Sequence, residues 1–429
     1  MTPSRRWPTL VASVIAALTA GLGYSWSVLL KPLAGDYGWS AAEVSLTFSA
    51  FMTTGAVAAL VTGKLQQYVQ PRTLVLVGGA LFGAGLVLLG SVHSLGAVYA
   101  FAALAGFGMG TVYPGATMSN LIRFFPDRSG FASGLLSAGA GLGAVVWAPL
   151  AVALIGRFDL AWALRILGVI FFVALALLSR IIRTAPNGYA PAGWTPSPER
   201  ASAATRPACD VDWRRMIRTP EFIALFMLFA VGTLSGMMVI GQGSPIAQQL
   251  LGITPAAAGA IVSLIAVGMV AGKVVWGAVS DRLGRSPVFV VLFLIAAVAL
   301  ATLTYTTSYA GVAACMAGVA FCYGGFIALM APATADDFGP VHLGVNFGIM
   351  FFTVAISSFV GPRIAAVVAD ANGGSFSEAF TIAAAMSVLG LALVAAHALL
   401  RRRRGASSTR PATDPPATRP HARSGRALR

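Results

Sequence analysis

A single basic side chain lies deep within one of the membrane-length apolar runs of this sequence. Lys273 stands inside the run from Val262 to Val279, and no Asp or Glu occupies the middle of any such run. An ammonium group donates up to three hydrogen bonds and pairs with anions. The residue types at this depth therefore favour a site for a small anion.

The depth of Lys273 allows two interpretations. Ionisable residues in the hydrocarbon region are costly, so they usually face a cavity, a partner or a substrate. Lys273 precedes Asp281 by eight residues, which is about 12 Å along a helix. Its flexible stem could instead carry the ammonium to the cytoplasmic interface. Both a binding role and such a snorkelling role stay open.

The elements that position Lys273 are membrane helices. Of the 429 residues, 57% are hydrophobic and only 10% are charged, which is too apolar for a soluble enzyme of this size. A helix needs about 20 apolar residues to cross a bilayer, and the sequence has twelve such runs. They are 8–30, 44–65, 73–92, 96–122, 130–155, 161–182, 220–243, 255–279, 287–307, 310–333, 344–369 and 378–400.

The net charge of +15 follows the membrane topology and does not indicate nucleic acid. Of the 29 Lys and Arg residues, 24 fall on one side of the predicted helices. By the positive-inside rule, both termini and the long central loop are cytoplasmic, as in a multi-pass protein of a bacterial-type inner membrane.

The chain divides into two halves that echo each other. A Pro- and Arg-rich linker, 184–219, separates residues 1–183 from residues 220–400, and a basic tail, 401–429, is expected to be disordered. Ser40 and Thr254 are expected to cap the second span of each half, and Ser40 forms a capping box with Glu43. We therefore expect an all-α integral membrane fold, with twelve transmembrane helices in two pseudo-symmetric six-helix bundles. Similar halves around a central cavity imply alternating access.

Further polar and aromatic residues lie within the predicted spans, and each has a packing alternative. Tyr113 stands about 15 Å into the fourth span, where its phenol needs a hydrogen-bond partner that could be substrate. Tyr24, Trp26 and Tyr323 are candidate cavity walls, or else packing or interfacial residues. Gln242 lies between two glycines that would permit local unwinding, so binding and packing roles are both open.

The turn between spans 8 and 9 carries a gating motif. Residues Gly277–Arg285 read Gly-Ala-Val-Ser-Asp-Arg-Leu-Gly-Arg, a signature similar to that of the major facilitator superfamily. Through this resemblance, Asp281 could pair with Arg282, with Arg285 or with a neighbouring helix terminus, and so latch a cytoplasmic gate. The alternative is a solvated turn whose arginines only fix the topology. The first-half loop that starts at Gly63 lacks this Asp.

Finer motifs resemble the oxalate/formate antiporter family and the related monocarboxylate transporters. They are Tyr24–Val28, Lys31-Pro-Leu, Tyr37–Ser40, Arg123–Gly130, Ala132–Gly134, Asp337–Gly339 and Leu343–Gly348. In this resemblance Lys273 matches a basic residue of span 8, and Asp127 and Arg128 join the gating residues. The second Lys of the dicarboxylate exchanger falls on Ala355, and its span-10 aromatic and acidic positions fall on Gly324, Phe326 and Ala328. The resemblance implies transport of small carboxylates. Because one cation suits one carboxylate, we expect a monocarboxylate.

The expected function is secondary active transport of small organic anions, as anion exchange or as anion–proton symport. A proton-coupled drug exporter of the same superfamily is the alternative, although such exporters generally need a membrane carboxylate. Nothing at helix depth suggests an enzyme, a cofactor or a metal site, and Cys315 and Cys322 have no metal spacing. The expected partners are a small carboxylate, with or without a proton, and membrane lipid, with a monomer as the functional unit.

Overall fold

The fold was examined in a computed structural model. It describes residues 6–26, 29, 32, 33, 39, 41–186, 189–191 and 210–407. Within these ranges every regular element is a helix. Lys31, Ser40, most of the central linker and the end of the tail lie outside the described residues, as does the side chain of Tyr24.

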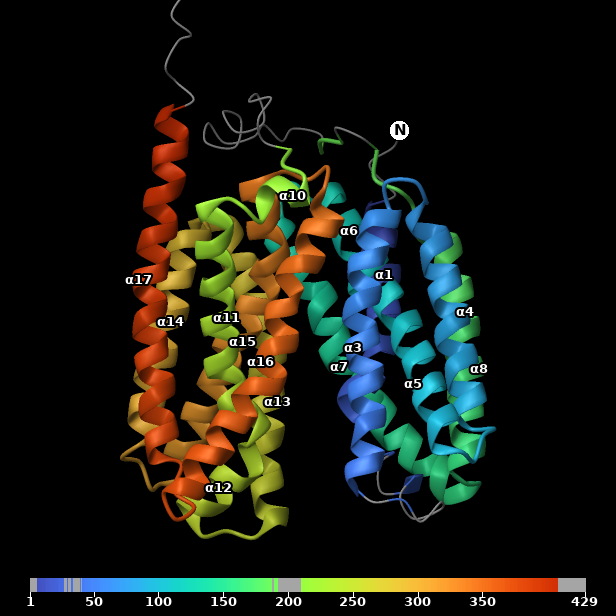
Figure 1. Cartoon of the computed structure of the whole chain (residues 1–429), viewed down its shortest axis with the longest axis horizontal. Helices are drawn as coiled ribbons and strands as arrows, with labels where there is room; N and C mark the ends of the chain where they lie inside the picture. Colours follow the sequence, from blue (N-terminus) through green and yellow to red (C-terminus); the bar gives the residue numbers. More distant parts are fainter. Residues whose placement is uncertain are drawn as a thin grey trace, which may run out of the picture.

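Helices of the first half occupy one side of the molecule (Figure 1). They are α1 (Arg6–Ala20), η2 (Gly21–Ser25), α3 (Ala41–Leu65), α4 (Pro71–Leu89), α5 (Leu95–Gly110), η3 (Thr111–Ala116), α6 (Met118–Phe124), α7 (Ser129–Arg157) and α8 (Leu160–Ile181).

The helices of the second half form the other side. They are α10 (Trp213–Met216), α11 (Pro220–Gly241), α12 (Gly243–Leu251), α13 (Pro255–Leu283), α14 (Arg285–Leu303), α15 (Tyr309–Phe338), α16 (Leu343–Ala371) and α17 (Ser377–Ser407). Eleven helical segments among the described residues are long and apolar enough to cross a membrane. The predicted first span is formed by α1 together with η2, which gives the twelve-span fold that the sequence predicted.

Side chains and prolines start several of these helices. Thr254 accepts a hydrogen bond from the backbone nitrogen of Ala257, as predicted, and Pro255 fills the first turn of α13. Thr219 caps α11 in the same way, with Pro220 following it. A Thr or Ser cap satisfies one of the free N–H groups at a helix start, and Pro has no N–H to satisfy there.

The predicted fourth span is broken in its middle. The sequence predicted one helix over 96–122, but the helix is interrupted at Thr111–Ala116, where Tyr113 has an extended backbone conformation (φ −133°, ψ 127°). Pro114 explains the break, because it has no N–H to donate and its ring obstructs the preceding turn. Tyr113 is buried at this break.

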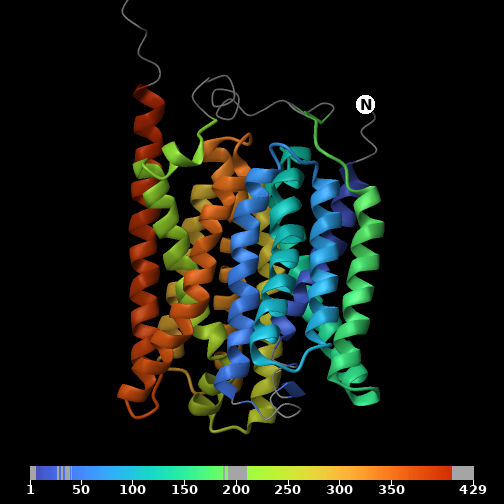
Figure 2. The ribbon, with the colours of Figure 1, turned by 45° about the vertical axis from the view of Figure 1, so that its right-hand side comes forward.

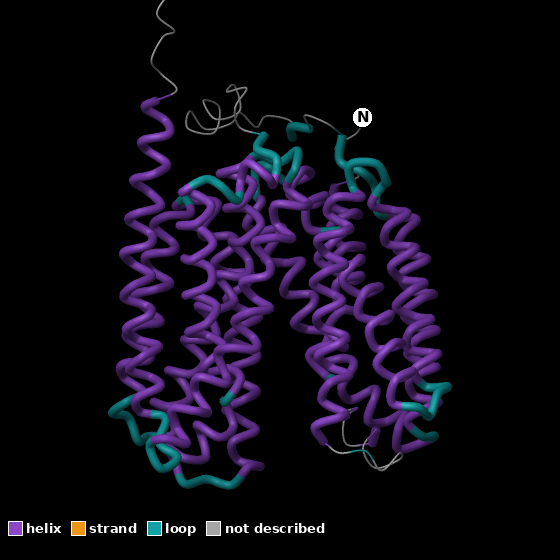
Figure 3. The backbone as a smooth tube through the Cα atoms, viewed as in Figure 1, coloured by secondary structure: helices purple, strands orange, loops and turns teal. Residues whose placement is uncertain are grey.

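The two bundles meet at one end of the molecule and their helices diverge toward the other (Figure 3). We call the meeting end, where α1 begins, α10 lies and α17 finishes, the linker end. Here α7 packs against α13, and α3 packs against α16. The rotated view in Figure 2 shows the same long helices running side by side from end to end.

Glycines bring the helix backbones together at the linker end. A Cβ placed on Gly134 of α7 would overlap the carbonyl oxygen of Lys273 in α13, and one on Gly63 of α3 would overlap that of Gly344 in α16. Small residues allow such close approach in membrane proteins. The glycines of α7 serve two contacts, because Gly134 and Gly141 face α13 whereas Gly139 and Gly143 face α1.

The last helix extends farther than the sequence predicted. The final span was expected to end at residue 400, yet α17 continues to Ser407 and includes arginines assigned to the disordered tail. Arg401 pairs there with Asp337 of α15, with Nε 3.0 Å from Oδ1. The same carboxylate contacts Nε2 of His397 at 2.6 Å, so α17 is fixed to the end of α15 by polar contacts to the buried carboxylate of Asp337.

Candidate functional site

Lys273 lies at the contact between the two bundles. Its side chain is 1% exposed, and Nζ donates a hydrogen bond of 3.2 Å to the carbonyl oxygen of Ser137 in α7. The ammonium of the second bundle is thus held by the backbone of the first. A buried ionisable side chain of this kind is a candidate functional residue.

The Lys273 side chain points away from the linker end. Its backbone carbonyl lies beside Gly134, whereas Nζ lies beside Ser137 and would be 3.3 Å from a Cβ placed on Gly141. Because α7 runs from the linker end to the far end, Nζ is about one to two helical turns deeper than its own backbone. This direction is opposite to snorkelling toward the linker end.

Close helix packing fixes the Lys273 backbone. A Cβ on Gly272 would overlap the carbonyl oxygen of Phe321, and one on Gly324 would overlap that of Met269. Helix α13 therefore contacts α15 on one side and α7 on another, at the level of Lys273. Gly324, which replaces an aromatic or acidic residue in the resemblance, provides room for this backbone contact.

The other predicted substrate residues have packing partners. Trp26 donates from Nε1 to the hydroxyl of Thr47 at 3.1 Å and stacks on Phe51. The amide of Gln242 donates to the carbonyl oxygen of Pro362 at 3.1 Å, which ties α11 to α16. For these two side chains the structure displays the packing alternative that the sequence left open.

Tyr323 and Tyr113 are both buried, one in each bundle. The Tyr323 ring packs against Gly236 of α11, where a Cβ would be 2.9 Å from the ring. Tyr113 belongs to the interrupted segment η3, which contacts α1, α3 and α16. Irregular backbone at membrane depth is tolerated where protein buries it or where it lines a cavity. Tyr113 therefore remains a candidate, in a segment that contacts helices of both bundles.

Two of the five predicted gating residues join the bundles. The carboxylate of Asp281 accepts hydrogen bonds from the backbone nitrogens of Gly130 (2.9 Å) and Phe131 (2.8 Å) at the start of α7. Arg285 pairs with Asp281 at 3.1 Å and also donates to the hydroxyl of Ser129 at 2.8 Å. A carboxylate at a helix N-terminus is stabilised by the free N–H groups and by the helix dipole.

Arg285 extends this cluster within the second bundle. Its Nε lies 3.1 Å from Oδ2 of Asp336, and it also donates to the hydroxyl of Ser280. The guanidinium is buried, and its planar fork serves several acceptors at once. We call Asp281, Arg285 and the start of α7 the charged latch.

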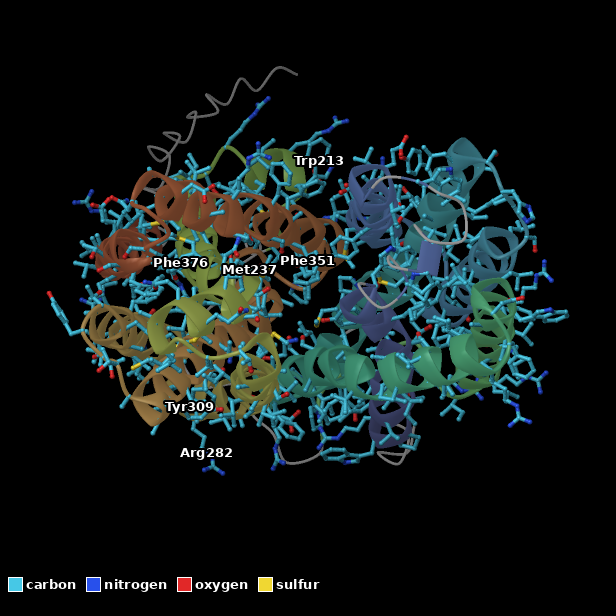
Figure 4. All side chains as sticks on the ribbon, turned by 90° about the horizontal axis from the view of Figure 1, so that it is seen from below. Trp213, Met237, Arg282, Tyr309, Phe351 and Phe376 are labelled. Carbon is cyan, nitrogen blue, oxygen red and sulfur yellow. The ribbon has the colours of Figure 1, made fainter. Side chains whose placement is uncertain are left out.

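The remaining three gating candidates lie elsewhere. Arg282 is exposed and projects from the perimeter of the molecule (Figure 4), so it is not the partner of Asp281. Asp127 pairs with Arg6 of α1 at 3.1 Å, within the first bundle. Arg128, whose side chain is 62% exposed, lies 3.9 Å from Asp127. The five gating candidates thus make different contacts: Asp281 pairs with Arg285 and the start of α7, and Asp127 pairs with Arg6.

Sequence reasoning missed two other contacts between the bundles. Arg123 of α6 donates to the carbonyl oxygens of Pro340 (3.2 Å) and Val341 (2.9 Å), in the turn before α16. Nε2 of Gln67 lies 3.1 Å from Nδ1 of His342. Arg123 belongs to one of the motifs of the family resemblance. Because an Arg near the end of a span is also explained by the positive-inside rule, its contact with the other bundle was not predicted.

The described residues contain no group of three His, Cys, Asp or Glu side chains that could hold a metal ion.

A family model described as Major Facilitator Superfamily matches residues 11–245 and 235–428. The chain belongs to the Major Facilitator Superfamily. With the twelve-span helical fold, this makes it a multi-pass membrane transporter. Its place among transporters agrees with the expectation that it is not an enzyme.

Relatives within the superfamily are similar over most of the chain. Identity is 30% over 393 residues to the oxalate:formate antiporter of Oxalobacter formigenes, covering 90% of each chain. It is 25% over 332 residues to monocarboxylate transporter 12 of Rattus norvegicus, covering 72% of this chain and 68% of that one. The resemblance predicted from the motifs is confirmed.

Among solved structures, the fold is similar to that of FucP, a superfamily transporter in the outward conformation. The TM-score is 0.69 at 14% identity, covering 92% of this chain and 98% of FucP. At this identity the likeness concerns the fold alone.

Proposed function

We propose that this superfamily member is a secondary active transporter of small organic anions, with monocarboxylates as its substrates. The observation that carries the proposal is the buried ammonium of Lys273, held between the bundles and directed away from the linker end. A substrate carboxylate would replace the Ser137 carbonyl as its acceptor. Hydrogen bonds between two ionised groups are shorter and stronger than those to a neutral carbonyl.

The number of cations supports a singly charged substrate. Ala355 of α16 stands where the dicarboxylate exchanger has a second Lys in the resemblance, so that position brings no positive charge. A buried dianion beside one ammonium would keep an uncompensated charge, which is strongly unfavourable at low dielectric. A monocarboxylate matches the charge of Lys273. The relatives named for oxalate, formate and monocarboxylates support small carboxylates as the wider substrate class.

The arrangement of the bundles supports alternating access. By the positive-inside rule the linker end is cytoplasmic, in a bacterial-type inner membrane, so the described conformation is closed toward the cytoplasm. Lys273 lies next to this closed contact, where a substrate entering from the far end would meet it. Reorientation then requires α7 to part from α13 and α3 to part from α16. Exchange and proton symport can both use this motion.

Uptake into proteoliposomes tests the proposal. Purified protein is reconstituted and supplied with radiolabelled formate, acetate, lactate, pyruvate and oxalate, and Lys273→Ala is compared with wild type. At least one monocarboxylate should be taken up by wild type. Removing one member of a close charge pair typically costs 2–5 kcal/mol, so the variant should lose about 30-fold or more in uptake efficiency.

Lys64→Ala is the matched control, since Lys64 is the other lysine among the described residues and is exposed at the end of α3. It should transport like wild type. Equal uptake by Lys273→Ala and wild type would reject Lys273 as the anion site. If no carboxylate is carried and lipophilic cations stabilise the protein, the drug-exporter alternative gains the support instead.

A further inference from the structure

Ser137 presents a buried hydroxyl that the described fold does not use. The side chain is 0% exposed, and among the described residues its Oγ has no hydrogen-bond partner. A buried polar group without a partner typically costs about 1–3 kcal/mol. Such exceptions in native structures require an explanation.

Several other buried hydroxyls among the described residues donate within their own helices. Ser280 donates to Gly277 at 2.8 Å, Thr334 to Met330 at 2.7 Å, and Ser387 to Ala383 at 3.0 Å. Back-bonding to the preceding turn is the usual solution for Ser and Thr in helices. Ser137 could adopt it toward its own preceding turn, but its hydroxyl is turned elsewhere.

The surroundings of Ser137 are those of an anion site. Its carbonyl oxygen accepts a hydrogen bond from Nζ of Lys273 at 3.2 Å, so the residue that carries the unused hydroxyl is in direct contact with the ammonium. One helical turn farther along the same face, Gly141 has no side chain, and a Cβ there would be only 3.3 Å from Nζ. A donor, a cation and a bare stretch of helix thus come together.

We propose that Ser137 is the second ligand of the substrate carboxylate. Its hydroxyl donates to one carboxylate oxygen, while Nζ of Lys273 binds the other. This inference rests on the proposed function and adds a consequence, since Ser137 belongs to the first bundle and Lys273 to the second. One bound carboxylate therefore bridges both bundles. In the empty carrier, the bond from Lys273 to the Ser137 carbonyl makes the corresponding link.

If the proposal is right, Ser137→Ala weakens substrate binding but does not lower the stability of the substrate-free protein. The purified full-length variant is titrated with the monocarboxylate that wild type binds best, and the unfolding temperature is measured with and without it. Losing a hydrogen bond to a charged group should raise Kd about 10- to 100-fold. Without substrate the unfolding temperature should stay equal or rise, because the variant removes an unsatisfied hydroxyl. Ser137→Thr keeps the hydroxyl and should bind within a few-fold of wild type.

Ser13→Ala is the matched control, since Ser13 is equally buried and its Oγ also has no partner among the described residues. It lies in α1, which packs on the Gly139 face of α7, away from α13. Its Kd should match wild type.

Four results would overturn the proposal. Unchanged affinity in Ser137→Ala, with binding lost in Lys273→Ala, removes the role of Ser137 and leaves the proposed function standing. An equal affinity loss in Ser13→Ala, or a lower unfolding temperature of substrate-free Ser137→Ala, assigns the hydroxyl to structure. Absence of carboxylate binding by wild type rejects both proposals.

Discussion

Two buried charged residues of this carrier, Lys273 and Asp281, are stabilised by different partners. Lys273 uses a backbone carbonyl of the other bundle, and Asp281 uses the N–H groups that begin α7. Both arrangements satisfy a buried charge with backbone dipoles. Both also depend on the two bundles being together, so these residues report directly on the conformation of the carrier.

At this scale we expect Asp281→Asn to weaken the charged latch. The variant keeps the shape of the side chain but removes the charge that faces Arg285 and the start of α7. Hydrogen bonds to charged groups contribute about 1.5–3 kcal/mol each, so thermal unfolding of the purified protein should begin several degrees lower. The exposed neighbour Arg282→Ala is the control. Equal unfolding temperatures for the two variants would contradict the latch.

The sequence could predict Lys273 and Asp281, because a charge within an apolar run or a known motif stands out by residue type. It could not predict Ser137, since Ser is common in membrane helices and only the missing partner distinguishes it. The sequence also could not show which arginine pairs with Asp281. Arg282 and Arg285 were equal candidates for Asp281, and the four-residue spacing that places Arg285 over Asp281 becomes decisive only once the turn at Gly284 is known.

Glycines determine how closely the helices pack around Lys273, because they carry no side chain at the contacts. Gly134 lets α7 touch the backbone of Lys273, and Gly324 lets α15 touch it from another side. The sequence shows that α7 is rich in glycine. It did not predict two separate contacts, because the partner of each face depends on how the helices are arranged around α7.

At the scale of elements, Gly134→Ala should prevent full closure of the linker end. Its new Cβ would overlap the carbonyl oxygen of Lys273, a backbone atom that cannot rotate away. We expect spin labels on α7 and α13 near this end to show a longer mean distance than in wild type. Gly156→Ala, in the same helix with nothing within 4 Å of its Cβ, is the control. An unchanged distance in Gly134→Ala would contradict this account of the contact.

The whole molecule closes at one end through two unlike edges. The α7–α13 edge carries the charged latch, whereas the α3–α16 edge has the uncharged amide of Gln67 beside His342. The first-half loop lacks the Asp that the second half supplies, which is consistent with this asymmetry. The twelve spans and the two halves were likewise predictable from apolar runs and the internal echo, but which conformation the bundles adopt was not.

A reversible cross-link across the α3–α16 contact tests whether the linker end must open during transport. Cysteines at Gln67 and His342, joined by a short bifunctional thiol reagent that is cleaved by reduction, should stop transport because the linker end can no longer open. Reduction should restore it, and each single cysteine variant should be unaffected by the reagent. Transport at the wild-type rate with complete cross-linking would contradict the proposed opening.

The most direct test of the central claim is equilibrium binding of a radiolabelled monocarboxylate to the purified carrier and to Lys273→Met, which keeps an unbranched side chain and removes the charge. The account predicts saturable binding by wild type, displaced by other small carboxylates, and a Kd raised about 30-fold or more in the variant. Equal affinity of the two proteins for the same carboxylate would contradict it.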